Sequence, residues 1–200
     1  LCFTASSSNA EALRVGSKRF TESYILGEII VRTAGDAQVT VTHRPGLGNT
    51  GILYAALRTG SIDLYPEYTG TIAKEILKLE GGAGLEALNR ALAPLGFGVA
   101  VPLGFNNSYA LAMREERAQA LGIRRLSDLA RHPALKLGLS QEFIGRADGW
   151  PGLKAAYALP FATPTGLDHG LAYEAMAAGR IDVMDIYTTD AKIERFQLRA

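Results

Sequence analysis

The chain has 200 residues, of which 48% are hydrophobic and 20% are charged, and 21 basic residues stand against 20 acidic ones, for a formal charge of +1. This hydrophobic share can bury a sizeable core, so the composition excludes intrinsic disorder and permits one large domain or two lobes. A near-neutral charge without a lysine or arginine run argues against nucleic acid or a membrane surface as a partner and favours a small neutral or zwitterionic ligand.

The first eleven residues have the composition of a leader. Ser8, Asn9 and Ala10 form the small-x-Ala pattern typical of a signal-peptidase site, so we interpret residues 1–11 as a signal-peptide remnant or a disordered leader. The single cysteine, Cys2, excludes an internal disulfide and a structural zinc site, while a lipid anchor there is a weaker alternative. No run approaches the ~18 apolar residues of a membrane span.

Short apolar runs alternate with helical patterns along the remaining chain. The segment from Glu22 to Thr33 predicts a helix with Thr21 as its N-cap and Gly35 just after its end. Its apolar face carries Ile25, Leu26, Ile29, Ile30 and Thr33. Such alternation predicts an α/β fold with mainly parallel sheets and a ligand site beyond the carboxyl ends of the strands. The predicted strands are residues 12–15, 38–42, 62–65, 97–101, 109–113, 135–139 and 181–186.

An internal repeat relates two segments of the chain. The stretch from Gly51 to Thr69 recurs in register between Gly170 and Thr188, with glycine, tyrosine, Ile-Asp and Tyr-Thr at matching positions. Each copy predicts a helix ended by glycine, a short buried strand and a tyrosine just past that strand. Two halves would then each offer a tyrosine to a shared cleft. The alternative is that any two α/β units resemble each other in this way.

A third tyrosine, Tyr109, follows the polar triplet of residues 106–108 at the start of an apolar strand. Such a triplet is typical of a loop that faces a ligand or crosses between lobes. With Tyr68 and Tyr187 it would supply three ring faces. These suit a cation that cannot hydrogen-bond, such as trimethylammonium, at about 0.5–2 kcal/mol per ring. The alternative is that tyrosines at strand ends pack half-buried with a hydrated hydroxyl.

The chain resembles the substrate-binding proteins of osmoprotectant ABC transporters, which bind glycine betaine, choline and carnitine. The resemblance is carried by Val15 to Glu22 and by the string Ile-Asp-Leu-Tyr-Pro-Glu-Tyr-Thr-Gly-Thr from Ile62 to Thr71. It extends over about residues 12–195 through further motifs in the same order. These are Leu47 to Thr50, Asn106 to Leu111, Phe143 to Gly149, Ile181 to Val183 and Tyr187 to Asp190.

The resemblance implies the type II periplasmic binding protein fold, with two α/β lobes around a hinge. We expect residues 12–104 to form the N-terminal part of lobe 1 and residues 105–187 to form lobe 2. Residues 188–200 would begin the return toward lobe 1, which the chain would lack beyond Ala200 together with the family's remaining cage tyrosine.

The resemblance also implies six ligand-binding residues. One group would enclose the quaternary ammonium, and the other would hold a ligand carboxylate. Arginine offers a fork of donors, lysine a point charge, and the threonine lies near a helix start where the dipole favours an anion. The alternative for the two cations is a solvated surface position. The first group is Tyr68, Tyr109 and Tyr187, and the second is Lys18, Thr71 and Arg146.

The choice of ligand stays open in this sequence. Ser23 and Asn49 stand where the family pattern has Gln and Gly. The presence of both Lys18 and Arg146 favours a betaine, because choline has no carboxylate for them to hold. Choline and ergothioneine, a betaine of histidine bound by some relatives, remain alternatives.

A nucleotide site is a weaker alternative. Gly46, Gly48 and Gly51 follow a predicted strand and open a helix, with Glu67 further on, so they match the spacing of the dinucleotide fingerprint. However, Pro45 precedes them and no catalytic half for a hydride acceptor is visible.

We expect no enzyme activity, no cofactor and no metal. The sequence lacks a Walker lysine, a Gly-x-Ser-x-Gly elbow and a His-Glu-x-x-His motif, and His43, His132 and His169 occur in unrelated contexts. A cleft enzyme would need a general acid or base, for which Asp148 and Asp190 are the nearby candidates. The expected protein is periplasmic or extracytoplasmic, or membrane-associated through its transporter, and delivers a quaternary-ammonium ligand to an ABC permease.

Overall fold

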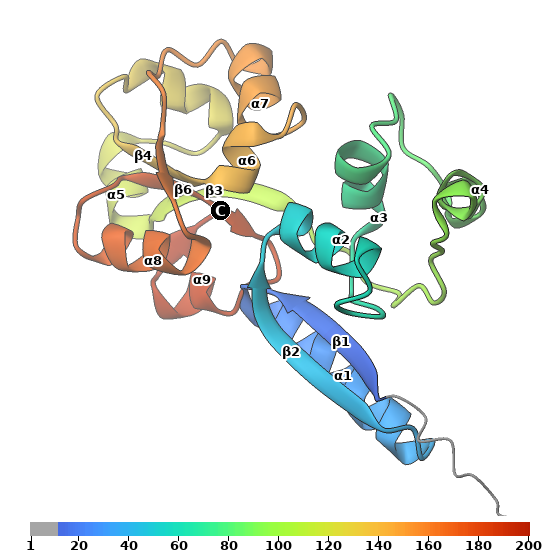
Figure 1. The fold of residues 1–200 in the computed structure, drawn as a ribbon. Helices are drawn as coiled ribbons and strands as arrows, with labels where there is room; N and C mark the ends of the chain where they lie inside the picture. Colours follow the sequence, from blue (N-terminus) through green and yellow to red (C-terminus); the bar gives the residue numbers. More distant parts are fainter. Residues whose placement is uncertain (1–11) are drawn as a thin grey trace, which may run out of the picture. The chain divides into compact units, whose positions relative to one another are not determined.

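A computed structural model describes residues 12–200 (Figure 1). They divide into two compact units, one ending at Pro66 and the other running from Glu67 to Ala200. The expected leader, residues 1–11 with Cys2, lies outside the described residues. The expected lobe boundaries at residues 104 and 187 stay predictions. None of the helices within 12–200 combines the length and apolar character needed to cross a membrane.

The first unit contains a parallel two-stranded sheet. Its elements are β1 (Leu13–Lys18), α1 (Thr21–Asp36), β2 (Val41–Gly48) and α2 (Thr50–Arg58). Helix α1 connects the two strands and packs along both of them (Figure 1). Val15, Leu53 and Ile62 are almost completely enclosed and form the centre of this unit. The register of the sheet shifts between Gly16 and Lys18, just where the strand delivers the lysine predicted to bind a ligand.

Helix α1 differs from the predicted helix at both ends. Phe20 is the N-cap and makes no side-chain cap, so Thr21 begins the helix rather than capping it. At the other end the helix runs through Gly35 to Asp36. The chain turns only at Gln38, which has a φ of 60°. This turn delays β2, which starts three residues later than the predicted strand.

The predicted apolar face of α1 is only partly buried, with Leu26 and Ile30 half-buried and Thr33 exposed. Ile25 and Ile29 are 53% and 52% exposed, whereas the buried residues are Ser23 and Gly27. Small side chains let the helix lie close to the sheet: a Cβ at Gly27 would come within 2.5 Å of His43 Nε2. Close approach of the helix therefore decides which of its residues are fully buried.

The second unit contains a five-stranded sheet in the order β5-β4-β6-β3-β7. Strands β4, β5 and β6 are parallel, and β3 runs antiparallel to both β6 and β7. The strands are β3 (Tyr109–Arg114), β4 (Leu137–Ser140), β5 (Thr165–Leu167), β6 (Val183–Tyr187) and β7 (Leu198–Arg199). The helices are α3 (Thr69–Thr71), α4 (Leu85–Leu92), α5 (Glu115–Leu121), α6 (Gln141–Gly145), α7 (Trp150–Ala156), α8 (His169–Ala177) and α9 (Lys192–Arg195). A π-helical segment at Ile72–Ile76 and 3₁₀ segments at Ala93–Leu95 and Leu126–Arg131 complete it.

Two of the predicted strands do not form. Residues 62–65 make a single bridge, from Leu64 to Val15. Residues 97–101 form no strand because the Asn89 side chain occupies the backbone of Val99, accepting from its amide at 2.7 Å and donating to its carbonyl at 3.0 Å. The structure adds β5 and β7, which are too short to leave a periodic pattern in the sequence.

The core of the second unit lies on both faces of the sheet. Along β6, Val183 packs into one cluster with Leu139 and Trp150, while Met184 and Ile186 pack into the other. Because side chains alternate along a strand, Tyr187 emerges on the same face as Val183.

The internal repeat corresponds to two equivalent turns, one in each unit. Helices α2 and α8 begin after Asn49 and Asp168, whose side chains accept bonds from backbone amides of the first turn. Each copy then turns at a glycine with a φ of 67°. In each, an aspartate accepts a bond from a strand amide: Asp63 from Arg14 at 2.7 Å, and Asp182 from Lys136 at 2.9 Å. The repeat is therefore structural, although only its second copy continues into a full strand.

Two glycines of α1 allow a matched test of its packing. We expect Gly27→Ala to lower the free energy of unfolding by about 1–3 kcal/mol, because the added methyl group meets the His43 ring. Gly35→Ala, in the same helix with open space around it, should raise that free energy by about 0.5–1 kcal/mol. Urea unfolding of both variants measures the difference. Equal effects of the two substitutions would contradict the close packing of α1 on the sheet.

Candidate functional site

Two of the predicted cage tyrosines form a cross-strand pair. Tyr109 opens β3 and Tyr187 ends β6, and the two residues are direct partners in the antiparallel register. Their ring centroids are 5.0 Å apart with a 46° tilt, and their hydroxyls are 3.4 Å apart. The Phe143 ring lies 5.0 Å from Tyr109 on another side. The pair gives two adjoining aromatic walls at the end of the sheet.

Arg146 connects this pair to Thr71. Its guanidinium carbon lies 5.4 Å from the centroid of the Tyr109 ring, within the range of a cation–π contact. One terminal nitrogen donates to Thr71 Oγ1 at 3.2 Å. The arginine side chain is only 5% exposed, so it needs partners that offset the loss of its hydration. Its main partner is Asp148, which accepts bonds of 2.9 and 2.8 Å from Nε and the other terminal nitrogen.

Tyr68 lies immediately before the helical segment that carries Thr71. Its hydroxyl accepts a bond from Asn107 Nδ2 at 3.4 Å, and Asn107 Oδ1 accepts one from Thr188 Oγ1 at 3.5 Å. Asn107 therefore bridges Tyr68 to the residue that follows Tyr187. Five of the six predicted binding residues are connected in this way within the second unit.

The sixth predicted residue, Lys18, belongs to the first unit. Its side chain is buried, with 4% of the residue exposed, and Nζ donates to Thr50 Oγ1 at 2.8 Å. Ser23 Oγ accepts a bond from the Lys18 backbone amide at 2.8 Å. A buried ammonium bound to the Thr50 hydroxyl is not the solvated surface cation that was the alternative for this residue.

Acidic side chains surround the two tyrosines. Burial raises the pKa of Tyr109 above its usual range, and the charge of Glu142 adds to this effect. Burial likewise raises the pKa of Tyr187, and Tyr109, Glu142 and Asp185 add to it. Both phenols are therefore neutral at physiological pH, and their surroundings carry negative charge.

Asp185 is held below the tyrosines by Ser140. It accepts bonds from the Ser140 backbone amide at 2.5 Å and from Ser140 Oγ at 2.7 Å. Burial raises the pKa of Asp185 despite these bonds. The same serine caps α6, where its hydroxyl accepts a bond from Phe143 N. Ser140 thus fixes both the acidic group and the helix that leads to Arg146.

A histidine that the sequence treats as incidental contacts the cage. The ring of His169 lies 4.7 Å from that of Tyr187, and its edge meets Tyr173 at 5.6 Å. His169 Nε2 lies 3.6 Å from Asp190, which also accepts a bond from the Tyr173 hydroxyl at 2.8 Å. Thr50 occupies the matching position in the first copy of the internal repeat but contacts Lys18, so the repeat does not signal this role.

Three residues of the first unit are arranged like a hydrolase triad, which sequence reasoning missed because they are distant along the chain. His43 Nε2 lies 2.8 Å from Ser17 Oγ, and Nδ1 lies 2.6 Å from Glu28 Oε1. Ser17 is completely buried, however, so its hydroxyl cannot reach a substrate. The three side chains join β1, β2 and α1 and have a bracing role.

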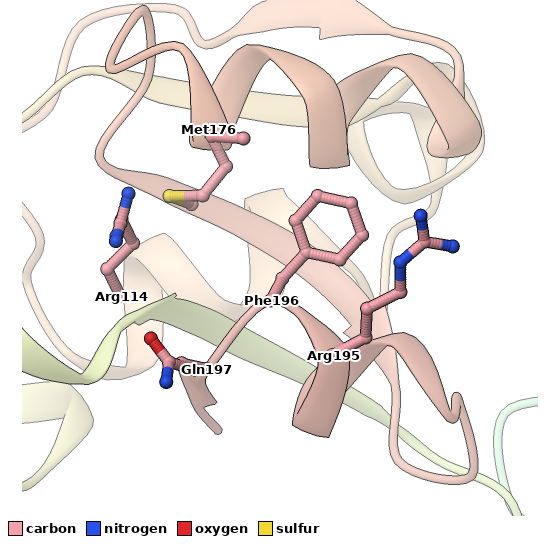
Figure 2. A pocket seen from close by; sticks show the side chains of 6 residues that line it. Arg114, Met176, Arg195, Phe196 and Gln197 are labelled. Carbon is pink, nitrogen blue, oxygen red and sulfur yellow. The ribbon is translucent and has the colours of Figure 1, made fainter.

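A cavity of about 200 Å³ in the second unit lies among residues from β3, α8, the end of α9 and the chain that follows it (Figure 2). It contains none of the six predicted binding residues. The side chains of Met176 and Phe196 lie between those of Arg114 and Arg195 (Figure 2). Its lining consists of Arg114, Met176, Ala177, Arg195, Phe196 and Gln197.

Comparison with known proteins finds one family, described as the substrate binding domain of ABC-type glycine betaine transport systems, which matches residues 11–200. A glycine-betaine-binding protein of Pseudomonas aeruginosa is 35% identical over 98% of this chain and 68% of its own length. The ergothioneine transport permease and binding protein EgtU of Helicobacter pylori is 34% identical over 94% of this chain, which spans 35% of that protein.

Solved structures show the same likeness. A glycine betaine/carnitine/choline ABC transporter structure superimposes with a TM-score of 0.64 at 26% identity, covering 94% of this chain and 72% of that one. Apo YehZ from Escherichia coli gives a TM-score of 0.58 at 28% identity, with coverage of 95% and 74%. These likenesses confirm the predicted fold class, that of type II periplasmic binding proteins.

The elevated tyrosine pKa values can be measured. Tyr109, Tyr173 and Tyr187 should ionise only well above pH 10.0, the ordinary pKa of the side chain, because burial disfavours each phenolate. A titration of phenolate absorbance measures this. Tyr109→Phe and Tyr187→Phe should leave the absorbance change around pH 10 unaltered, and either variant that reduces it would contradict the buried pair.

Proposed function

The chain belongs to the family of substrate-binding domains of ABC-type glycine betaine transport systems, and we propose that it captures a betaine-type quaternary ammonium solute for an ABC permease. The observation that carries this proposal is the Tyr109–Tyr187 pair with acidic side chains around it. A trimethylammonium group forms no hydrogen bonds, so it is recognised by ring faces and by negative potential. Glu142 and Asp185 supply that potential without contributing a donor.

The polar end of the site favours a ligand that also carries a carboxylate. Arg146 offers a planar fork of donors beside the Tyr109 ring, and Thr71 offers a hydroxyl. Lys18 would add a second cation, buried and bound to Thr50 in its own unit. Glycine betaine has both the cationic group and the carboxylate, and it is the proposed ligand.

A second candidate ligand is ergothioneine. EgtU, whose name describes ergothioneine transport and binding, is 34% identical to this chain, almost the same as the 35% of the glycine-betaine-binding protein. Ergothioneine also carries a trimethylammonium group and a carboxylate, so the same residues would bind both. Choline shares only the cation and would gain little from Arg146.

Binding and delivery require no covalent chemistry, and we propose that the protein is not an enzyme. The two candidate acid–base residues are already engaged: Asp148 by Arg146, and Asp190 by Tyr173 and Lys192. Although burial opposes the effect, the neighbouring His169 and the bonds from the Lys192 amide and the Tyr173 hydroxyl lower the pKa of Asp190. We further propose an extracytoplasmic location, as the role of supplying a permease requires, and no nucleic-acid partner, in keeping with the charge of +1.

Removing the aromatic walls tests the proposed function. We expect Tyr109→Leu and Tyr187→Leu each to weaken glycine betaine binding by about 2- to 30-fold, which corresponds to the ~0.5–2 kcal/mol of one ring. Tyr68→Ala should weaken binding by a similar factor with little effect on folding, because the Tyr68 side chain is only partly buried. Tyr157→Leu is the matched control, since Tyr157 is 41% exposed and ends α7. Isothermal titration calorimetry measures the affinities.

A thermal unfolding panel identifies the cargo. Glycine betaine, carnitine, choline, ergothioneine and NADH are compared, and a bound ligand at 100 times its dissociation constant adds about 2.7 kcal/mol to stability. We expect a shift with glycine betaine or ergothioneine. A shift with NADH alone, or full affinity in the two leucine variants, would refute the proposed cation site.

A further inference from the structure

The cation that would hold a ligand carboxylate is already held by a carboxylate of the protein itself. Asp148 accepts bonds from Arg146 Nε and from a terminal nitrogen at 2.9 and 2.8 Å, a bidentate geometry. This is the arrangement with which arginine binds a carboxylate ligand. Asp148 therefore occupies one edge of the guanidinium fork in this structure.

The electrostatics of the pair agree with this geometry. Burial opposes the charged forms of both residues, yet the hydrogen bonds between them raise the pKa of Arg146 and lower that of Asp148. Glu142 Oε1 lies 4.0 Å from the remaining terminal nitrogen of Arg146. The single positive charge thus faces two carboxylates, which weakens the attraction of Arg146 for a third.

The two members of the pair differ in their access to water. The Arg146 side chain is 5% exposed, whereas that of Asp148 is 39% exposed. Asp148 can therefore turn to solvent and be hydrated there, while the buried arginine must keep a partner. A ligand carboxylate can replace Asp148 on the fork, whereas a ligand without one leaves the pair intact.

We propose that Asp148 sets the specificity of the site by competing with the ligand carboxylate for Arg146. The competition weakens carboxylate-bearing ligands such as glycine betaine and spares ligands such as choline, which have only the quaternary ammonium. This inference rests on the proposed function, because it assumes that the tyrosine pair binds the cation. It assigns Asp148 an action through Arg146, rather than a direct contact with the ligand.

Neutralising Asp148 tests the competition. The Kd values of glycine betaine and choline are measured by calorimetry at one pH and one ionic strength. We expect Asp148→Asn to raise the ratio of the choline Kd to the betaine Kd by about tenfold, an order-of-magnitude value for a partly exposed charged pair. Asp148→Glu, which keeps the carboxylate, should stay close to the wild-type ratio. Asp36→Asn is the control for net charge, since Asp36 is exposed at the end of α1.

The ratio separates specificity from damage to the site. A structural role for Asp148 would weaken both ligands together and leave the ratio unchanged, and this outcome overturns the inference. A fall in the ratio also overturns it, because it would mean that Asp148 orients Arg146 for the ligand. Should choline binding be too weak to measure, the betaine Kd decides, with tighter binding expected in Asp148→Asn than in Asp36→Asn.

The failure of the proposed function gives a different result. If the wild-type protein binds neither glycine betaine nor choline, the proposed function fails and the inference fails with it. If it binds glycine betaine and the variants behave alike, only the inference fails. Asp148→Ser removes the same charge with a smaller side chain and carries the same expectation if Asp148→Asn does not fold.

Discussion

The candidate site depends above all on the antiparallel pairing of β3 with β6. This pairing sets Tyr109 opposite Tyr187 and Leu111 opposite Asp185. Alternation along the two strands then directs the tyrosines to the face that carries Val183, while Ala110 and Ile186 pack on the other face. A slip of one residue would exchange the two faces and bury the phenols in the wrong cluster. The hydrophobic cores of the second unit therefore hold the aromatic walls in register.

A second constraint is the burial of Arg146. A guanidinium with 5% exposure must be surrounded by acceptors, and Asp148, Glu142 and Thr71 lie around it. These groups fix the position of the charge beside the Tyr109 ring. Because Asp148 and Glu142 lie so close to Arg146, their negative charges offset its positive charge before any ligand binds. The aromatic and ionic side chains of the site are thus packed against each other. A substitution around Arg146 therefore affects the proposed cation site through the contact between Arg146 and the Tyr109 ring.

The fold class and the residues of the candidate site could be predicted from the sequence better than the contacts between those residues. Motifs with local meaning were reliable: the repeat located Tyr187, and the polar triplet located Tyr109. The prediction of a strand at residues 97–101 was wrong because the Asn89 side chain, ten residues before Val99, bonds the backbone amide and carbonyl of Val99. The predicted face of α1 was right only in part, because the closest packing of the helix rests on Gly27, which has no hydrophobic side chain to signal burial. The role of His169 could not be predicted, since it depends on rings brought together by tertiary contacts.

The repeated aspartate turns also bear on the order in which the units fold. Asp63 closes a loop of 49 residues back to Arg14, and Asp182 closes one of 46 residues back to Lys136. Because the entropy of loop closure grows only with the logarithm of length, the two closures differ by less than about 0.1 kcal/mol. The entropic cost of closing these loops is therefore nearly the same in the two units. The two units differ instead in the apolar surface that they bury, since the larger clusters of the described residues lie in the second unit.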